Sequence, residues 1–300
     1  MRLPSRPRRS ALYVPASNAK AIAKAEALPA DIIILDLEDA VAPEAKYSAR
    51  ITAIEAVKAG GFGKREVLIR CNPLDSPWGP ADLEAIASSD AAGILVPKVC
   101  SPRDIIVTEE GLRRAKDDLA LWIMIETCAA VNSVREIAMT ESNSRLSGLV
   151  LGTNDLAKEM RAQITRERAA FLPIFTTTIL AARQYGLAVL DGVCNEFTEL
   201  ARFETECIQG LVLGFDGKTL IHPRQIGSCN EVYSPTAAEI EWAEAIVAAF
   251  DSPENAGRGV IQLNGKMVEL LHADQARDLI IRYRAIEDLA TRRQNCRPLS

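Results

Sequence analysis

The sequence predicts an α/β fold, a (β/α)8 TIM barrel followed by a small C-terminal extension. Two observations lead to this prediction. Eight short runs of apolar and β-branched residues recur along the chain, and a stretch with the spacing of an amphipathic helix follows each run. Runs that are apolar on both faces are typical of parallel strands covered by helices. A doubly wound open sheet is the alternative, but no G-x-G-x-x-G sequence follows the first run.

The expected strands are distributed over the first 233 residues. They cover residues 10–16, 31–39, 66–72, 93–98, 119–127, 146–152, 188–193 and 210–216. Strict alternation of strands with helical stretches implies βαβ crossovers, and eight such units close a barrel. We therefore assign residues 1–233 to a barrel domain that carries the functional site.

The pattern changes after residue 233, and we assign residues 234–300 to a C-terminal extension. Its expected elements are a helix over 236–250, a Pro- and Gly-rich break over 252–259, a hairpin over 260–268 and a helix over 272–293. The hairpin should turn at Asn264 and Gly265, because both residues tolerate positive φ. The extension is too short for an independent core, so we expect it to pack on the barrel or to cap a neighbouring subunit.

The composition excludes several classes of function. With 35 basic and 40 acidic residues the net charge is −5, which disfavours nucleic acids and anionic membranes as partners. Seven scattered cysteines without a C-x-x-C pair indicate a reduced chain, and only two histidines make a zinc site improbable. No apolar run reaches the length of about 18 residues that a membrane span needs. We expect a cytoplasmic protein.

A basic cluster stands at the N-terminus, formed by Arg2, Arg6, Arg8 and Arg9. Such a cluster is either a solvated tail or a grip on a phosphate-bearing ligand. We take Arg9 as a candidate substrate-binding residue.

Acidic residues follow several of the expected strands. In a barrel the carboxyl ends of the strands converge on one mouth, where Glu38, Asp39, Glu126, Asp155 and Asp191 would gather. Adjacent strands lie about 4.8 Å apart, so Glu126 and Asp155 could hold one cation between them. Carboxylates without nearby histidine or thiolate favour Mg²⁺. The alternative for Asp155 is a helix cap.

Two basic residues also end expected strands. The planar guanidinium of Arg70 suits a carboxylate or a developing oxyanion of the substrate, or else an ion pair with Glu38 or Asp39. Lys98 follows Pro97 and is a candidate to contact substrate. It would act as a Schiff-base nucleophile, or as a charged group held among the carboxylates.

Two further segments are weaker candidates. The residues after the eighth expected strand, Asp216 to Lys218 with His222 and Pro223, would suit phosphate or backbone positioning, or simply form a turn. Glu269 follows the expected hairpin and, taken alone, is a solvated carboxylate.

These residues carry a resemblance: from Arg9 to about Ala276 the chain resembles the citrate lyase β-subunit and malyl-CoA lyase family, within the HpcH/HpaI aldolase/citrate lyase superfamily. The segments that carry it are Arg9 to Pro15, Asp36 to Val41, Arg70-Cys71-Asn72, Pro97-Lys98, Ile125-Glu126-Thr127, Gly152 to Leu156, Gly214 to Lys218 and Ile221-His222-Pro223. Each segment alone is weak, but their order and spacing together are specific.

The resemblance implies roles for several residues. It implies that Glu126 and Asp155 bind Mg²⁺, that Arg70 contacts the keto-acid portion of the substrate, and that Glu38 and Asp39 support the site. It also implies a homo-oligomer, a trimer or a hexamer built from trimers. In it the C-terminal segment closes over a neighbouring barrel and brings an acid that exchanges the proton at the thioester α-carbon.

The chain departs from the family pattern at this acid. Where relatives read Met-Val-Asp followed closely by Pro, this chain reads Met267-Val268-Glu269-Leu270. Glu269 is therefore our candidate for that proton exchange. Ala16 also stands where glycine is usual.

The function implied is that of an Mg²⁺-dependent carbon–carbon lyase of the aldol or Claisen type. Its substrate would be a 3-hydroxyacyl-CoA such as malyl-CoA, β-methylmalyl-CoA or citramalyl-CoA, split into a 2-keto acid and an acyl-CoA. The alternatives are the citryl-ACP lyase β-subunit of a citrate lyase, a malyl-CoA-type thioesterase, and a non-catalytic barrel scaffold.

Overall fold

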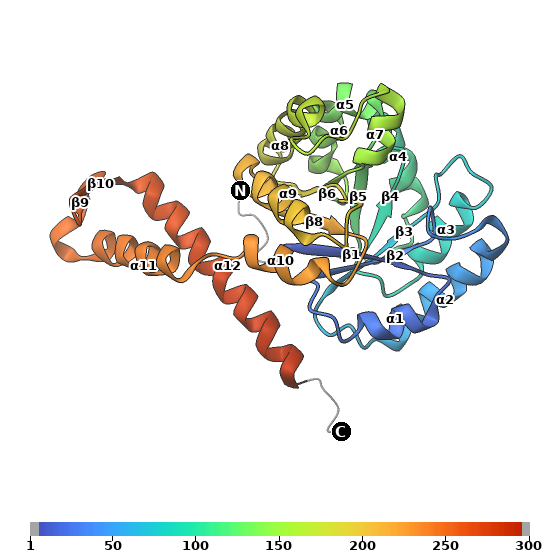
Figure 1. Ribbon diagram of the computed structural model, residues 1–300, viewed down its shortest axis with the longest axis horizontal. Coiled ribbons are helices and arrows are strands. Elements are labelled where there is room, and N and C mark those ends of the chain that lie inside the picture. The colour runs from blue at the N-terminus through green and yellow to red at the C-terminus, as the bar shows by residue number, and fades with distance from the viewer. Residues whose placement is uncertain (1–5, 296–300) are drawn as a thin grey trace. The chain divides into compact units, whose positions relative to one another are not determined.

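The computed structural model describes residues 6–295, and its main body is a closed barrel of eight parallel strands in the order β1 to β8 (Figure 1). The strands are β1 (Ser10–Pro15), β2 (Ile32–Asp36), β3 (Glu66–Arg70), β4 (Gly93–Val96), β5 (Ala120–Ile125), β6 (Leu146–Leu151), β7 (Ala188–Asp191) and β8 (Gly217–Leu220). The barrel closes where β8 pairs with β1. The predicted (β/α)8 fold is confirmed.

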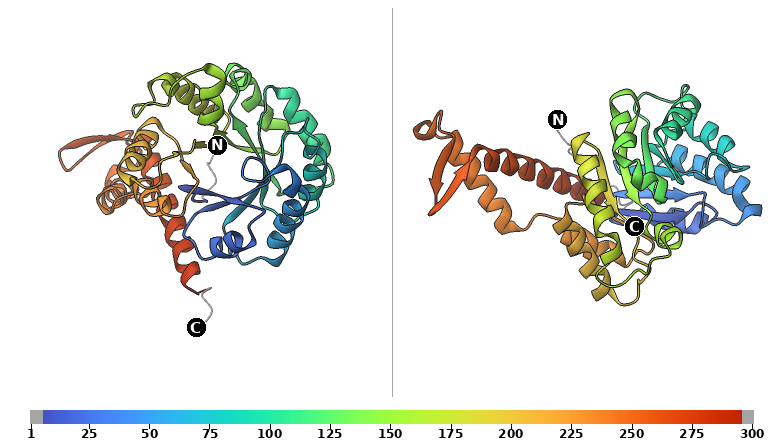
Figure 2. Two further views of the ribbon diagram at one scale, coloured as in Figure 1. Left: turned by 45° about the vertical axis from the view of Figure 1, so that its right-hand side comes forward. Right: turned by 90° about the horizontal axis from the view of Figure 1, so that it is seen from above.

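Helices surround the strands on the outside of the barrel (Figure 2). They are α1 (Ala19–Ala25), α2 (Lys46–Ala59), α3 (Gly79–Ala87), α4 (Pro102–Gly111), α5 (Cys128–Asn132), α6 (Val134–Met139), α7 (Thr153–Met160), α8 (Leu172–Gln184), α9 (Leu200–Leu213) and α10 (Gln225–Val232). Short 3₁₀ turns precede α2 and α8 and follow α6, at Pro43–Ala45, Ala169–Phe171 and Thr140–Asn143.

Successive side chains of each strand point alternately into the barrel and outward against the helices, and both environments are apolar, which explains why the runs are apolar throughout. Ile32 and Ile34 of β2 point into the barrel, where they join a cluster with Trp122, while Ile33 and Leu35 point outward into the larger cluster under the helices. The same alternation places the residues that end each strand either inside the mouth or against the helices.

The eighth strand lies later in the chain than predicted. Residues 210–213 complete α9, which ends at Gly214 with a φ of 104°, and β8 is Gly217–Leu220. The apolar run Gly-Leu-Val-Leu fits a helix end as well as a strand, so periodicity alone could not separate them. The real strand looked polar because it contains Lys218, which is fully buried and paired with Asp191 and Glu206.

The amino-terminal end of the barrel is closed by buried ion pairs. Arg8 binds Glu66 through Nε at 2.9 Å and covers the ring of Trp122, and Arg9 binds Asp31 through Nε at 2.8 Å. Arg9 precedes β1 and is buried at the end of the barrel opposite the mouth. The structure therefore does not bring Arg9 to the predicted site, and its charge serves Asp31. Arg6 is exposed, and Arg2 lies outside the described residues.

A second compact unit follows the barrel unit Arg8–Tyr233, and within it the structure describes residues 234–295. It contains α11 (Ala237–Asp251), a 3₁₀ turn (Pro253–Asn255), the antiparallel pair β9 (Val260–Leu263) and β10 (Lys266–Glu269), and α12 (Leu270–Asn295). Asn264 and Gly265 form the turn with φ values of 48° and 78°. The helices and hairpin expected here are confirmed, and they enclose a small apolar cluster of their own around Ile246 and Val268.

No helix within residues 6–295 is both long enough and apolar enough to cross a lipid bilayer.

The packing inside the barrel gives a stability prediction. A Cβ added at Gly148 would lie 2.3 Å from the ring of Trp122, so Gly148→Ala should lower the free energy of unfolding by about 1–3 kcal/mol. Urea unfolding followed by circular dichroism measures this. The control is Gly227→Ala on α10, where a Cβ meets nothing within 4 Å and stability should be unchanged or slightly higher. Equal unfolding midpoints for Gly148→Ala and the unaltered chain would contradict the packing described.

Candidate active site

A cavity of about 310 Å³ opens at the carboxyl ends of the barrel strands. Its polar walls come from Asp36, Asp39, Arg70, Glu126, Asn154, Asp155 and Asn195, and its apolar walls include Tyr13, Met124, Leu151, Val193 and Ile221. The mouth thus combines several charged groups with apolar surface, which is the usual make-up of a site for a small molecule.

Glu126 points into this mouth from the end of β5. It continues the alternate positions of Trp122 and Met124, which point into the barrel, and it is 1% exposed. Oε1 accepts the backbone N–H of Lys98 at 2.8 Å, whereas Oε2 is buried and bonds to no group of the described residues. Burial raises the pKa of Glu126, with Lys98 opposing the shift. A buried carboxylate oxygen without a partner calls for a ligand.

The space for Glu126 depends on a neighbouring glycine. A Cβ at Gly152, the residue before α7, would lie 2.3 Å from Glu126 Cβ and 2.6 Å from Oε2. Oε2 therefore faces the start of α7, the helix that carries Asp155 in its first turn. The segment from Gly152 to Asp155 thus leaves space for the side chain of Glu126 and brings Asp155 to the same side of the mouth.

Lys98 connects the two carboxylates. Its Nζ lies 2.6 Å from Asp155 Oδ1 and 3.4 Å from Glu126 Oε1. Burial alone would lower the pKa of Lys98, but Asp155 and Glu126 outweigh it and hold the pKa above its usual value. An amine that stays protonated is a poor Schiff-base nucleophile, so the charged interpretation of Lys98 fits better.

The donor set suits a hard divalent cation. Glu126 offers a buried free oxygen, Asp155 is partly exposed beside it, and the cavity leaves room for water and substrate oxygens. Within residues 6–295 no group of three or more His, Cys, Asp or Glu side chains is arranged to hold a metal. Glu126 and Asp155 would hold a cation as a pair of ligands and leave positions open for water and substrate oxygens, as Mg²⁺ commonly does.

Arg70 is held rigidly from the neighbouring strand. Its Nε and Nη2 each donate to one oxygen of Asp36 at 2.7 Å, a bidentate pair between β3 and β2. Asp36 also accepts the backbone N–H groups of Glu38 and Ala40. Asp36 was not among the predicted site residues. Its inward orientation could have been predicted, because it continues the alternation of Ile32 and Ile34, which point into the barrel.

Glu38 and Asp39 both contact Arg70, as expected, but in different surroundings. Arg70 Nη1 lies 2.7 Å from Glu38 Oε2, which is buried and not aligned for a hydrogen bond, and 3.1 Å from Asp39 Oδ2. Burial raises the pKa of Glu38 to about 8, against the opposing effect of Arg70. Asp36, which accepts two hydrogen bonds from Arg70, is the carboxylate that holds the guanidinium most closely. The Asp39 side chain is 68% exposed at the rim.

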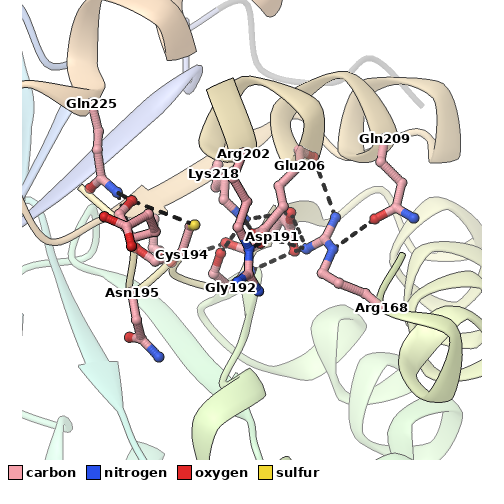
Figure 3. Close-up of polar contacts among 12 residues, drawn as sticks. Arg168, Asp191, Gly192, Cys194, Asn195, Arg202, Glu206, Gln209, Lys218 and Gln225 are labelled. Carbon is pink, nitrogen blue, oxygen red and sulfur yellow. Dashed lines mark hydrogen bonds and ion pairs between the residues drawn. The ribbon is translucent and has the colours of Figure 1, made fainter. Parts of the chain in front are cut away.

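Asp191 does not reach the mouth, contrary to its placement among the mouth acids. It faces the helices, where Arg168 Nη1 binds it at 2.7 Å and Lys218 Nζ at 2.8 Å, with Glu206 completing the cluster (Figure 3). Lys218 is part of this cluster, and Asp216 pairs with Arg183. The phosphate interpretation of Asp216 to Lys218 is therefore wrong, since their charges are satisfied inside the protein.

This buried cluster shapes one wall of the cavity. Lys218 Nζ donates to the carbonyl of Gly192 at 2.6 Å, and Gln225 Nε2 donates to the carbonyl of Cys194 at 3.0 Å (Figure 3). The loop fixed in this way carries Val193 and Asn195 into the cavity wall. Asn195 also exchanges hydrogen bonds with Asn154 at 2.9 and 3.2 Å across the rim.

Glu269 belongs to the second unit. It ends β10 with an exposed side chain, and its backbone N–H donates to Nδ1 of His272 at 2.9 Å. Its expected role at a neighbouring subunit stays a prediction.

Comparisons with known proteins show which family this chain is similar to. The sequence model of the family described as HpcH/HpaI aldolase/citrate lyase matches residues 9–223. A (3S)-malyl-CoA thioesterase of Cereibacter sphaeroides is 44% identical over 280 residues, which cover 93% of this chain and 96% of that protein. The citrate lyase subunit beta of Escherichia coli is 34% identical over 285 residues, covering 93% and 94% of the two chains.

Solved structures are similar as well. The structure of CitE from Mycobacterium tuberculosis in complex with magnesium, acetoacetate and coenzyme A has a TM-score of 0.74 at 26% identity. The similarity covers 91% of this chain and 97% of that one.

The Arg70–Asp36 pair gives a second stability prediction. Asp36→Asn should lower the free energy of unfolding by about 3 kcal/mol, because it removes the charge of the bidentate partner and leaves the buried guanidinium only its contacts with Glu38 and Asp39. Asp39→Asn removes a charge from the same arginine at an exposed position and should cost less than about 1 kcal/mol. Urea titrations of both variants measure the difference. Similar losses in the two variants would mean that Asp36 does not balance Arg70.

Proposed function

This chain belongs to the HpcH/HpaI aldolase/citrate lyase family, and we propose that it is an Mg²⁺-dependent enzyme acting on a 3-hydroxyacyl-CoA of the malyl-CoA type. Our leading proposal for the reaction is carbon–carbon cleavage to a 2-keto acid and an acyl-CoA, or the reverse. The observation that carries it is the convergence of Glu126, Asp155 and Arg70 on one cavity, with Oε2 of Glu126 buried and without a hydrogen-bond partner among the described residues.

Each charged residue has a separate task in this proposal. Glu126 and Asp155 would hold the Mg²⁺, which when bound supplies Lewis-acid polarisation of substrate oxygens. Arg70, kept in place by Asp36, would turn Nη1, which contacts Glu38 and Asp39 in the structure, to the carboxylate or to the oxygen that develops negative charge. The apolar walls formed by Met124 and Leu151 limit access of water to these groups.

In cleavage, the hydroxyl of the substrate loses its proton and becomes the carbonyl of the keto acid, while the carbon–carbon bond breaks. The electron pair of that bond passes to the thioester α-carbon as an enolate, which then takes up a proton. We propose that Glu269 of a neighbouring subunit carries this proton, which would require a homo-oligomer, such as the trimer that the family resemblance implies.

Hydrolysis is the second candidate, and a specific observation favours it. The relatives from Cereibacter sphaeroides that are 42–44% identical over nearly the whole chain are named (3S)-malyl-CoA thioesterase. In that reaction water attacks the thioester carbonyl and the CoA thiol leaves, so the products are free hydroxy acid and CoA. The 34% identity to citrate lyase subunit beta supports a third candidate, a citryl-ACP lyase subunit that acts on a carrier-linked substrate.

The products distinguish these candidates. The purified chain with Mg²⁺ and (3S)-malyl-CoA should release glyoxylate and acetyl-CoA, measured with phenylhydrazine and by chromatography. Release of malate and free thiol instead would identify a thioesterase. EDTA should abolish either reaction. Turnover only with a citryl-ACP would identify the carrier-dependent subunit, and no Mg²⁺-dependent product from malyl-, β-methylmalyl- or citramalyl-CoA would reject the leading proposal.

Shared active sites can be tested by mixing two inactive variants. Glu126→Gln should lower kcat by about 10²–10³-fold, the usual effect of losing one electrostatic stabiliser, and Glu269→Gln should also be impaired. If the two residues act in different subunits, refolding the variants together restores sites that contain both wild-type residues. We expect activity well above that of either variant alone. A mixture no more active than its parts would place Glu269 outside a shared site.

A further inference from the structure

Lys98 has a backbone conformation that few side chains adopt. Its φ is 56°, in the left-handed region, although it is neither glycine nor asparagine. Residues held in such conformations concentrate at functional sites, where neighbouring contacts maintain them. Here the contact is the hydrogen bond from the Lys98 N–H to Glu126 Oε1 at 2.8 Å. The turn thus directs both the N–H and the ammonium group of Lys98 at the same carboxylate.

The ammonium group lies between the two acids. Nζ is 2.6 Å from Asp155 Oδ1 and 3.4 Å from Glu126 Oε1, and its side chain is 34% exposed at the cavity rim. Among the side chains of residues 6–291, no other lysine or arginine lies at ion-pair distance from either carboxylate. Two carboxylates that face one cavity repel each other, and Lys98 is the cation that offsets this repulsion.

We propose that Lys98 is a built-in counter-cation of this site, which pairs with Glu126 and Asp155 when no divalent ion is bound and lowers their affinity for one. This inference rests on the proposed function, because it assigns the competitor of the proposed Mg²⁺. The ammonium group of Lys98 and a divalent ion would bind the same two carboxylates. Binding of the ion would therefore displace or weaken the contacts of Nζ. The released ammonium is then free to face an anionic oxygen of the substrate.

Removal of the ammonium group tests the proposal by the direction of its effect. Lys98→Met keeps the length of the side chain and the same backbone requirement, but it leaves the two carboxylates unpaired. Titration with MgCl₂ alone, followed by calorimetry, should give a dissociation constant lower than that of the unaltered chain by about tenfold, because a nearby positive charge opposes a dication. Lys98→Arg keeps the charge and should bind Mg²⁺ with nearly unchanged affinity.

Two controls keep the result interpretable. Lys58→Met removes an exposed positive charge near the end of α2, away from the mouth, and should leave the Mg²⁺ affinity unchanged. If Lys98→Met fails to fold, Lys98→Gly removes the ammonium while easing the left-handed backbone, and it should show the same tighter binding.

The outcomes separate the inference from the proposed function. Equal or weaker Mg²⁺ binding by Lys98→Met would overturn the inference, since it would mean that Lys98 supports the carboxylates in holding the ion. The proposed function would survive that result. Catalysis that persists in EDTA would overturn the proposed function instead. Failure of every variant and of the unaltered chain to bind Mg²⁺ would overturn both.

Discussion

Opposite charges packed into the barrel mouth hold its strand ends in one arrangement, because each buried charge needs a partner that water cannot supply. Asp36 grips Arg70 across the neighbouring strands β2 and β3, and the backbone of the following loop folds over the same carboxylate. Arg70 cannot turn away without leaving Asp36 buried and unpaired. The guanidinium is therefore already oriented before any ligand arrives, which is the condition for efficient electrostatic stabilisation of developing charge.

Sequence reasoning could predict the barrel because alternation of apolar runs and helices needs no knowledge of distant contacts. It failed where a charge is neutralised by a residue far away in the chain. The strand β8 was not recognised because it contains a lysine, Lys218, whose charge is balanced by Asp191 from another strand and Glu206 from a helix. Arg9 looked available because Asp31, its partner, lies 22 residues away. Asp36 could have been predicted by counting the inward-facing positions of its strand, since the alternation of side chains along a strand depends on the strand's own sequence alone.

The cleavage and hydrolysis proposals share one half of the site. Recognition of the carboxylate and hydroxyl end of the substrate would use the same charged residues in both, and only the thioester end decides which bond breaks. In both proposals that end would lie toward the rim, where Asn154 and Asn195 bond to each other and the cluster around Lys218 supports the loop that carries Asn195. The relatives carry names of different reactions, (3S)-malyl-CoA thioesterase and citrate lyase subunit beta, so membership of the family does not by itself decide the reaction.

The plug of Arg8, Glu66 and Trp122 makes the barrel a blind well, because it closes the end opposite the mouth and the interior between is filled with side chains. A cavity with one entrance restricts the order in which substrates can bind and products can leave. In the proposed cleavage the keto acid would lie deepest, beside Arg70, and would leave after the acyl-CoA; in the reverse reaction it would bind first. Such an order of binding and release would follow from the closed floor of the barrel.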